Sequence, residues 1–223
     1  MKRIVWDWNG TLLDDVDLSF QCINRLLKAN DLEPLCSLDA YRNVFDFPIQ
    51  SYYEKVGFDF SKKSYATLAQ SYMEDYQQKS YDCDLTDMAK STLALASELG
   101  YAQTILSASK KEYLDAQVQR YHISEYVDGI LGIQDIYANS KQMLAQAFVN
   151  GCDADDEIWF IGDSIHDFEV AQTHNLIKAR SVVKVKSNSN TCLFSCNPNE
   201  SSKIRATSIL DSSLACCKDN RRL

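Results

Sequence analysis

The spacing of hydrophobic residues divides the chain into two kinds of segment. Between residues 15 and 83, apolar positions recur at helical spacing and no strand pattern occurs among them. Pro34 and Pro48 interrupt this region, and Ser37 stands where a helix cap is expected. The pattern predicts a block of helices over residues 16–27, 37–44, 49–56 and 63–76.

Short apolar runs that suit buried strands lie on both sides of this helical block. The first covers residues 2–6 and is followed by the turn-forming pair Asn9-Gly10. After residue 83, strands alternate with amphipathic helices, a pattern typical of a parallel sheet covered by helices on both faces. The expected strands cover 103–106, 127–133, 157–161 and 182–185, and the expected helices cover 86–99, 110–121, 140–149 and 167–174.

Together these patterns predict an α/β fold, in which a doubly wound, Rossmann-like parallel-sheet core carries an inserted all-helical cap. The core is discontinuous, with residues 1–14 and 84–223, and the cap covers residues 15–83. The end of the chain departs from this pattern, because no glycine follows Gly162 and Ser, Asn and Cys dominate from Ser187 onward. We therefore expect the segment beyond Lys186 to pack irregularly.

Charge and composition limit the classes of partner. The 23 basic side chains are outnumbered by 31 acidic ones and form no basic stripe, which argues against nucleic-acid binding. No apolar run is long enough to cross a bilayer, and the stretch near the N-terminus meets Asp7, which argues against a membrane protein and a secretion signal. The eight cysteines include no Cys-x-x-Cys pair, so we expect reduced thiols in a cytoplasmic protein, either a monomer or a weak homodimer.

Polar residues stand at four positions where an expected strand ends or an expected helix begins. Asp7 follows the first strand, Ser107 the second, and Gly162-Asp163 the strand at 157–161, while Lys141 opens a helix. Ligands of parallel α/β sheets bind at the carboxyl ends of the strands. Paired carboxylates suit Mg²⁺, and a hydroxyl with a lysine suits a phosphoryl group. The combination predicts phosphoryl transfer through a carboxylate nucleophile.

Several of these assignments have competitors in the sequence. Lys110 and Lys111 compete with Lys141, and Ser109 competes with Ser107, which we favour because it directly follows the apolar strand. His166 is an alternative acid or base, although a solvated position in the first turn of a helix explains it as well. Three residues of the helical block are candidates to reach a substrate or to lie on the surface: Arg42, Tyr52 and Tyr53.

The ordered set of motifs resembles the haloacid dehalogenase superfamily, in particular its phosphoglycolate-phosphatase-like members. Asp7-Trp8-Asn9-Gly10-Thr11-Leu12 is similar to the first motif of that family, and Gly162-Asp163-Ser164-Ile165-His166-Asp167 is similar to the fourth. Ser107 and Lys141 fit the second and third motifs. The resemblance covers residues 1–186 and implies a Mg²⁺-dependent phosphatase that acts on a small phosphorylated metabolite.

The resemblance also implies a role for each motif residue. Asp7 would be the nucleophile and a Mg²⁺ ligand, and Asn9 would offer its backbone carbonyl to the metal. Asp163 would bind Mg²⁺ directly, and Asp167 directly or through water. Ser107 and Lys141 would hold the phosphoryl group and, with Asp7 and Asn9, make up the catalytic residues. Further residues of the motif loops would also lie at the phosphate: Trp8, Asn9, Thr11 and Ala108.

Asn9 departs from the family pattern, which has an aspartate at this position. That aspartate protonates the leaving group and later activates water, whereas an amide does neither. The departure predicts slow hydrolysis of alkyl phosphates and a smaller loss for acyl and aryl phosphates, whose leaving groups need no proton. It also favours an alternative function, a phosphate-ligand-binding or regulatory protein with weak turnover. We expect Asn9→Asp to fit without disturbing packing.

Overall fold

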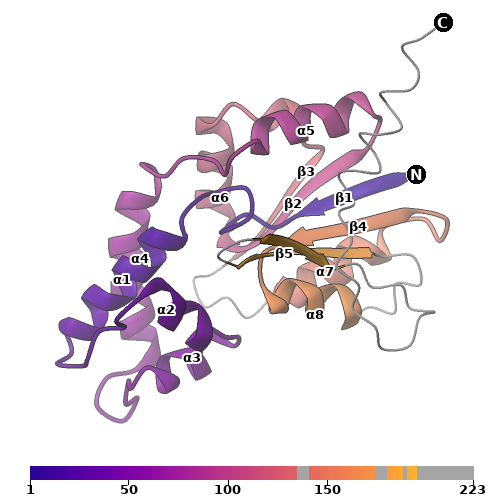
Figure 1. Cartoon of the computed structure of the whole chain (residues 1–223). Coiled ribbons are helices and arrows are strands. Elements are labelled where there is room, and N and C mark those ends of the chain that lie inside the picture. The colour runs from indigo at the N-terminus through magenta and orange to yellow at the C-terminus, as the bar shows by residue number, and fades with distance from the viewer. Residues whose placement is uncertain (135–140, 174–179, 188–189, 195–223) are drawn as a thin grey trace, which may run out of the picture.

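The computed structural model describes residues 1–134, 141–173, 180–187 and 190–194. Its centre is a six-stranded sheet with the order β3-β2-β1-β4-β5-β6 (Figure 1). The first five strands run parallel, and the sixth pairs antiparallel with β5. The strands are β1 (Lys2–Trp6), β2 (Ala102–Lys110), β3 (Gly129–Ile133), β4 (Glu157–Gly162), β5 (Arg180–Ser187) and β6 (Asn190–Phe194).

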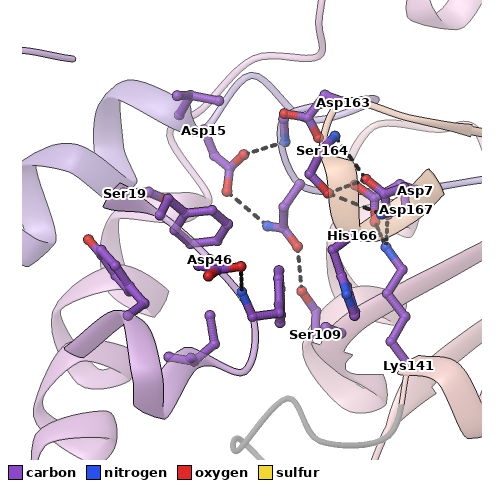
Figure 2. A pocket seen from close by; sticks show the side chains of 18 of the residues that line it. Asp7, Asp15, Ser19, Asp46, Ser109, Lys141, Asp163, Ser164, His166 and Asp167 are labelled. Carbon is purple, nitrogen blue, oxygen red and sulfur yellow. Dashed lines mark hydrogen bonds and ion pairs between the residues drawn. The ribbon is translucent and has the colours of Figure 1, made fainter. Parts of the chain in front are cut away.

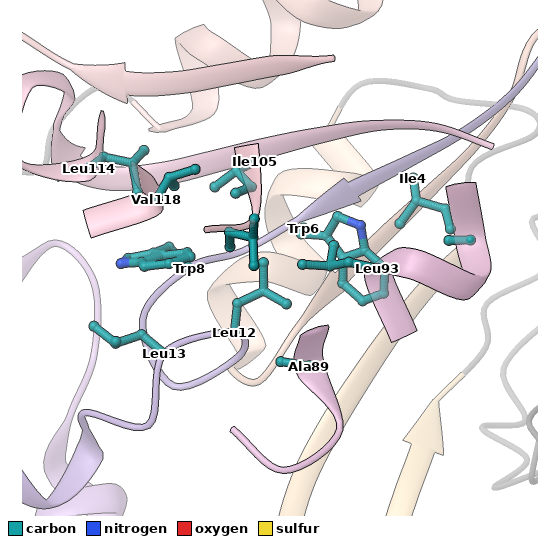
Figure 3. Packing of buried hydrophobic residues seen from close by; sticks show 12 residues of the cluster. Ile4, Trp6, Trp8, Leu12, Leu13, Ala89, Leu93, Ile105, Leu114 and Val118 are labelled. Atoms are coloured by element: carbon teal, nitrogen blue, oxygen red, sulfur yellow. The ribbon is translucent and has the colours of Figure 1, made fainter. Parts of the chain in front are cut away.

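Helices cover both faces of this sheet, which confirms the predicted doubly wound α/β class. Side chains of β1 alternate between the faces: Ile4 and Trp6 pack with α5 (Ala89–Glu98) and α6 (Lys111–Arg120), as Figure 3 shows. Val5 points to the other face, toward α7 (Lys141–Asn150) and α8 (Ile165–Thr173). A strand covered on both faces needs apolar residues at consecutive positions, as Ile4-Val5-Trp6 provides.

Five helices lie between β1 and β2, and the first four of them form a separate lobe toward which the arrowhead of β1 points (Figure 1). Their hydrophobic residues form a cluster of their own, which includes Ile23, Leu27, Tyr41 and Leu68. The four helices are α1 (Val16–Lys28), α2 (Leu38–Val44), α3 (Ile49–Lys55) and α4 (Tyr65–Ser80). We call residues 15–83 the helical insertion.

The chain leaves the sheet and returns to it at neighbouring positions. The backbone N–H of Asp14 donates to the carbonyl of Asp84 at 2.9 Å, and the N–H of Thr86 donates to the carbonyl of Leu12 at 2.9 Å. These two bonds tie the outgoing and returning segments together. They support our proposal that the boundaries between core and cap lie at residues 14/15 and 83/84.

One expectation about the C-terminal part is wrong. Residues 182–185 lie in a strand as predicted, but Asn190–Phe194 form a second strand, where we expected irregular packing. The run Thr191-Cys192-Leu193-Phe194 is mostly apolar and includes a β-branched and an aromatic residue, both of which suit a strand. The antiparallel partner β5 supplies the backbone hydrogen bonds that such a short strand needs. The rest of the predicted irregular tail, residues 195–223, lies outside the described residues.

Within the described part of the chain, no helix combines the length and the apolar character needed to cross a membrane. The described cysteine side chains are free thiols, at Cys22, Cys36, Cys83 and Cys152.

Candidate active site

Four charged side chains meet at the carboxyl ends of β1 and β4. Asp7 follows β1 and Asp163 follows β4, while Asp167 lies on α8 and Lys141 opens α7. The Lys141 ammonium donates to Asp7 Oδ1 and, at 2.5 Å, to Asp167 Oδ1 (Figure 2). Lys141, Asp7 and Asp167 are buried. The other two candidate lysines have different partners, because Lys110 pairs with Glu112 and Lys111 with Asp115.

Burial of these charges changes their protonation. Burial and the charge of Asp167 raise the pKa of Asp7 to about 7, although Lys141 counteracts both. Burial and the charge of Asp7 raise the pKa of Asp163 well above its usual value. Burial opposes ionisation of Asp167 too, but the charge and hydrogen bond of Lys141 lower its pKa below the usual value. One ammonium group therefore does not fully compensate three adjacent carboxylates.

This donor set suits a hard divalent cation. Carboxylate oxygens of Asp7, Asp163 and Asp167 lie within 4.8 Å of one another. Hard cations such as Mg²⁺ bind oxygen ligands, and the uncompensated negative charge favours such an ion. The three residues predicted as side-chain metal ligands therefore lie together and fit the expected ion.

Two glycines allow the carboxylates to approach the backbone closely. Gly10 has φ +72°, and a Cβ on it would lie 2.4 Å from Asp163 Oδ2. A Cβ on Gly162 would lie 2.4 Å from the Asp167 carboxyl carbon. Thr11, which we expected to orient this loop, has its hydroxyl 3.3 Å from Asp7 Oδ2 and 3.2 Å from Asp163 Oδ1. The loop after β1 and the end of β4 are thus in close contact with the Asp163 and Asp167 carboxylates.

Asn9 lies in a continuous hydrogen-bond network beside this cluster. Its amide nitrogen donates to Asp15 Oδ2 at 2.8 Å and to the Tyr76 hydroxyl at 2.8 Å. Its amide oxygen accepts from Ser109 Oγ at 2.7 Å and from Ser107 Oγ at 3.3 Å. These contacts fix which end of the amide faces each neighbour. They also correct our expectation for Asn9→Asp, because an aspartate would place two carboxylates against each other.

Asp15 is a site residue that our sequence analysis missed. It stands at the N-cap position of α1 but makes no side-chain capping bond there. Its carboxylate instead accepts from the Gly10 N–H at 2.7 Å, from Asn9, and from the Tyr76 hydroxyl at 2.6 Å. Burial raises the pKa of Asp15. An aspartate before a helix is an ordinary capping signal, so the sequence carries no sign that this one turns toward the cavity.

Ser107, our choice from the sequence, and its competitor Ser109 lie side by side at the end of β2 and both donate to Asn9. Strand β2 continues to Lys110, so Ser107 lies inside the strand rather than at the N-terminus of α6. Ser107 is 1% exposed, accepts from the Ser109 N–H at 3.0 Å, and does not line the cavity described below. Ser109 and Ala108 do line it. The apolar run in the sequence ends at Leu106, so hydrophobic spacing did not predict the last four residues of the strand, 107–110.

Trp8, a residue of the loop that we expected at the phosphate, has its side chain in the core. Its side chain is fully buried in the hydrophobic cluster of Figure 3, where its indole N–H donates to Gln117 Oε1 at 2.9 Å. The next residue, Asn9, lines the cavity while Trp8 does not. The side chain of Trp8 therefore anchors the loop in the core.

A cavity of about 510 Å³ opens between the sheet and the helical insertion. Its core side contains Asp7, Asn9, Thr11, Lys141 and the Asp163–Asp167 region. Arg42, Tyr52 and Tyr53, the three candidates from the insertion, all line it. The insertion contributes eight aromatic side chains to the lining: Tyr41, Phe45, Phe47, Tyr52, Tyr53, Tyr65, Tyr72 and Tyr76.

One aromatic contact joins the two sides of the cavity. The Phe47 ring of the insertion stacks on His166 of α8, with centroids 4.1 Å apart and planes 17° apart. His166 Nδ1 lies 3.8 Å from Glu169. Burial and the charge of Lys141 lower the pKa of His166, which favours a neutral ring at pH 7. His166 therefore lies at the junction between core and insertion.

Comparison with known proteins assigns this arrangement to a family. Three similar solved structures are a predicted phosphatase from Clostridium acetobutylicum, a haloacid dehalogenase-like hydrolase from Streptococcus pneumoniae and Protein Tyrosine Kinase A from Mycobacterium tuberculosis. Their identities are 18%, 20% and 16%, and their TM-scores are 0.67, 0.66 and 0.69. The matches cover 82%, 81% and 95% of this chain, and 83%, 83% and 96% of theirs.

No protein of curated function matches the sequence. Residues 4–179, however, match the haloacid dehalogenase-like hydrolase family, which is more than half of the chain. This match includes the first and fourth motifs and every residue of the charged cluster. The chain belongs to the haloacid dehalogenase-like hydrolase family.

Proposed function

We propose that this protein is a Mg²⁺-dependent phosphoric monoester hydrolase, which acts on a small phosphorylated metabolite through an aspartyl phosphate on Asp7. One observation carries the proposal: Asp7, Asp163, Asp167 and Lys141 form a largely buried cluster that lines a cavity at the carboxyl ends of the strands. This combination of a carboxylate nucleophile, oxygen ligands and a cation is what phosphoryl transfer requires.

The proposed reaction has two steps. The Asp7 carboxylate attacks phosphorus, the bond from phosphorus to the leaving oxygen breaks, and the leaving group takes the electron pair. Water then attacks the aspartyl phosphate, so that inorganic phosphate leaves and the Asp7 carboxylate is regenerated. Lys141 orients Asp7 and offers positive charge to the phosphoryl oxygens. Ser109 lines the cavity beside Asn9 and is placed to hold the same group.

Asp7, Asp163 and Asp167 would hold Mg²⁺ by their side chains, together with the backbone carbonyl of Asn9. When bound, Mg²⁺ supplies positive charge at the transferring phosphoryl group. The close grouping of three carboxylates, two of them buried, with a single lysine supports this assignment, because the cluster has excess negative charge without a metal.

Phosphate release tests the proposal. The purified protein is incubated with acetyl phosphate, phenyl phosphate and ethyl phosphate, with Mg²⁺ and after treatment with a chelator. We expect Mg²⁺-dependent release, fastest from acetyl and phenyl phosphate, because Asn9 cannot protonate the poorer ethoxide leaving group. Equal release with and without chelator would contradict the role of the metal, and no release from any ester would contradict the hydrolase.

The contacts of Asn9 also support a second candidate, a phosphate-ligand-binding protein with weak turnover. Its amide is engaged by four neighbours and offers no carboxylate to the leaving group. Calorimetry with inorganic phosphate and Mg²⁺ distinguishes the two functions. Binding without release of phosphate from any ester would favour the binding protein.

A further inference from the structure

The leaving group that the site can release restricts the substrate. An alkoxide leaving group is strongly basic and needs a proton as it departs, whereas phenols, like tyrosine, ionise near pH 10. Asn9 has no proton to transfer, and its amide donates instead to Asp15 and Tyr76. The core side of the cavity therefore favours esters whose leaving oxygen is attached to an aromatic ring or an acyl group.

The opposite side of the cavity distinguishes between these two classes. All eight Tyr and Phe residues of the lining come from the helical insertion. Several already pack ring against ring: Tyr72 stacks on Tyr76 with planes 10° apart, and Phe45 meets Tyr52 edge to face at 5.2 Å. Aromatic surfaces favour another ring in stacked or edge-to-face geometry. A small acyl group would leave most of this lining without a partner.

The volume of the cavity points the same way. About 510 Å³ lies within the usual range for sites that bind organic molecules of moderate size. A leaving group of two or three carbons would fill a small part of that space. A phosphate together with an aromatic ring and one substituent fills considerably more of it.

A buried hydroxyl group supplies a polar contact for such a substituent. Tyr52 is 3% exposed and lines the cavity, but its hydroxyl has no hydrogen-bond partner in the described part of the protein. Leaving a buried hydroxyl without a partner costs free energy, so a ligand that supplies one gains affinity. The hydroxyl of Tyr41, in the same lining, is not among the buried polar atoms that lack a partner in the described residues. Tyr52 lines the cavity while its hydroxyl oxygen is covered by neighbouring side chains, so a hydroxyl or carbonyl group on the substrate would reach it once these side chains shift.

The cations of the lining offer no equivalent site for a carboxylate on the leaving group. Arg42 pairs with Asp39 at 3.5 Å, Lys110 pairs with Glu112 at 3.0 Å, and Lys141 is held by the catalytic carboxylates. A second anionic group would have to share Arg42 or Lys110 with the acidic side chain that already pairs with it. The lining is therefore better matched to a neutral ring than to a short carboxylic acid such as glycolate.

We propose that the substrates are aryl phosphates, small phosphomonoesters of a phenol with a hydroxyl or carbonyl group elsewhere on the ring, and that the Tyr52 hydroxyl binds this group. The inference rests on the proposed phosphatase function. In the reaction, the bond from phosphorus to the phenolic oxygen breaks, the electron pair leaves with the phenolate, and the phosphoryl group moves to Asp7. Water later hydrolyses the aspartyl phosphate and supplies the proton that the phenolate takes up.

Binding measurements test the inference without requiring turnover. With Mg²⁺ present, calorimetry compares ethylphosphonate, benzylphosphonate and the 3- and 4-hydroxybenzylphosphonates, none of which is hydrolysed. We expect benzylphosphonate to bind about tenfold or more tighter than ethylphosphonate, because its ring is buried among aromatic side chains. At least one hydroxy derivative should gain a further factor of about 3 to 10. Equal affinity for the ethyl and benzyl compounds would overturn the inference.

Matched variants assign the hydroxyl contact to Tyr52. In Tyr52→Phe, we expect the benzyl and hydroxybenzyl compounds to bind equally, while the preference for benzyl over ethyl stays. Tyr41→Phe, which removes the hydroxyl of another tyrosine of the lining, should retain the preference for the hydroxy compound. A preference that persists in Tyr52→Phe would overturn the role of this hydroxyl.

Turnover separates a failure of this inference from a failure of the proposed function. Benzyl and ethyl phosphate both have poor leaving groups, and only benzyl phosphate has a ring. Phenyl and acetyl phosphate both have good leaving groups, and only phenyl phosphate has a ring. We expect the ring to lower KM and the better leaving group to raise kcat. Turnover with no effect of the ring on KM would overturn the aryl preference but not the phosphatase. No turnover, with tight binding of benzylphosphonate, would overturn the phosphatase but not ring recognition.

Discussion

The core side and the insertion side of the cavity differ in how their side chains are held. On the core side, each polar group is fixed by several partners: Lys141 bridges Asp7 and Asp167, and Asn9 bonds to four neighbours. On the insertion side, aromatic rings pack on one another, and the Tyr52 hydroxyl is unpaired in the described residues. The first arrangement positions reacting atoms, whereas the second offers surface to a ligand.

This difference predicts that the two sides control different kinetic constants. Changes on the core side should act on kcat for every substrate, since they alter the groups that transfer phosphate. Changes on the insertion side should act mainly on KM and on the choice of substrate. Variants on each side, and one outside the cavity, test this division.

Asp7→Asn should have the largest effect. The amide keeps the shape of the nucleophile but cannot form the acyl phosphate, so we expect kcat to fall by about 10⁴-fold or more for every ester. Steady-state kinetics on phenyl and acetyl phosphate measure the loss. Asp14→Asn is the matched control, because Asp14 is exposed and does not line the cavity. Full activity in Asp7→Asn would rule out the proposed nucleophile.

Exchange of Asn9 and Asp15 should have the next largest effect, because it moves a carboxylate to the position that faces the leaving group. Asn9→Asp alone places this carboxylate against the buried Asp15, and two such groups in contact do not both ionise. The double variant Asn9→Asp/Asp15→Asn restores one amide and one carboxylate. We expect it to raise kcat on ethyl phosphate by about tenfold or more, through general acid–base catalysis.

The single variant Asn9→Asp is the control for this exchange. We expect it to gain less activity than the double variant and to unfold at a lower temperature. Equal activity and equal thermal stability of the two variants would show that the contact between Asn9 and Asp15 does not matter. Freshly purified protein with a checked intact mass is needed, because the Asn9-Gly10 sequence is prone to deamidation.

The difference between the two sides also explains what the sequence could predict. Asp7, Lys141, Asp163 and Asp167 follow strands or open helices, and parallel strands bring such positions to one edge of a sheet. Local sequence is sufficient for that inference, and the structure brings all four together. The alternation of strands and helices along the core and the helical block after the first strand followed from hydrophobic spacing in the same way.

Other site residues depend on tertiary contacts that leave no local signal. Asp15 has the sequence context of a helix cap, and only the fold turns its carboxylate toward Asn9. We chose Ser107 over Ser109 because the apolar run of β2 ends just before Ser107. The strand in fact continues to Lys110, and Ser107 is buried within it. The aromatic lining is spread over three helices and their loops, so its members are not recognisable before the insertion folds.

Phe47→Ala should have a moderate effect, confined to binding. The variant removes the stack on His166 that joins the insertion to the core. Such contacts contribute about 0.5–1.5 kcal/mol, so we expect KM to rise by a factor of about 2 to 10 with a smaller change in kcat. Phe60→Ala is the matched control, since Phe60 packs within the same insertion but does not line the cavity. An equal rise in KM in both variants would show that the stack has no specific role.

Asp156→Asn should have the smallest effect on catalysis, because this buried aspartate lies outside the cavity, next to the start of β4. Hydrogen bonds from the amino terminus and from Arg3 Nε, each 2.6 Å long, lower the pKa of Asp156 to about 2. Because the pKa of Asp156 is lower in the folded protein than in the unfolded chain, ionised Asp156 stabilises the fold at pH values above its unfolded pKa. This stabilisation is lost as the pH falls through the folded pKa of about 2. Asp156→Asn should therefore lower the urea midpoint at pH 6, and the difference from the unmodified protein should narrow at pH 3.

Burial raises the pKa of Asp7, whereas well-placed donors lower that of Asp156, so only the first carboxylate should affect turnover. A large loss of kcat in Asp156→Asn, or a stability difference that does not change with pH, would contradict this distinction between a reacting and a structural carboxylate.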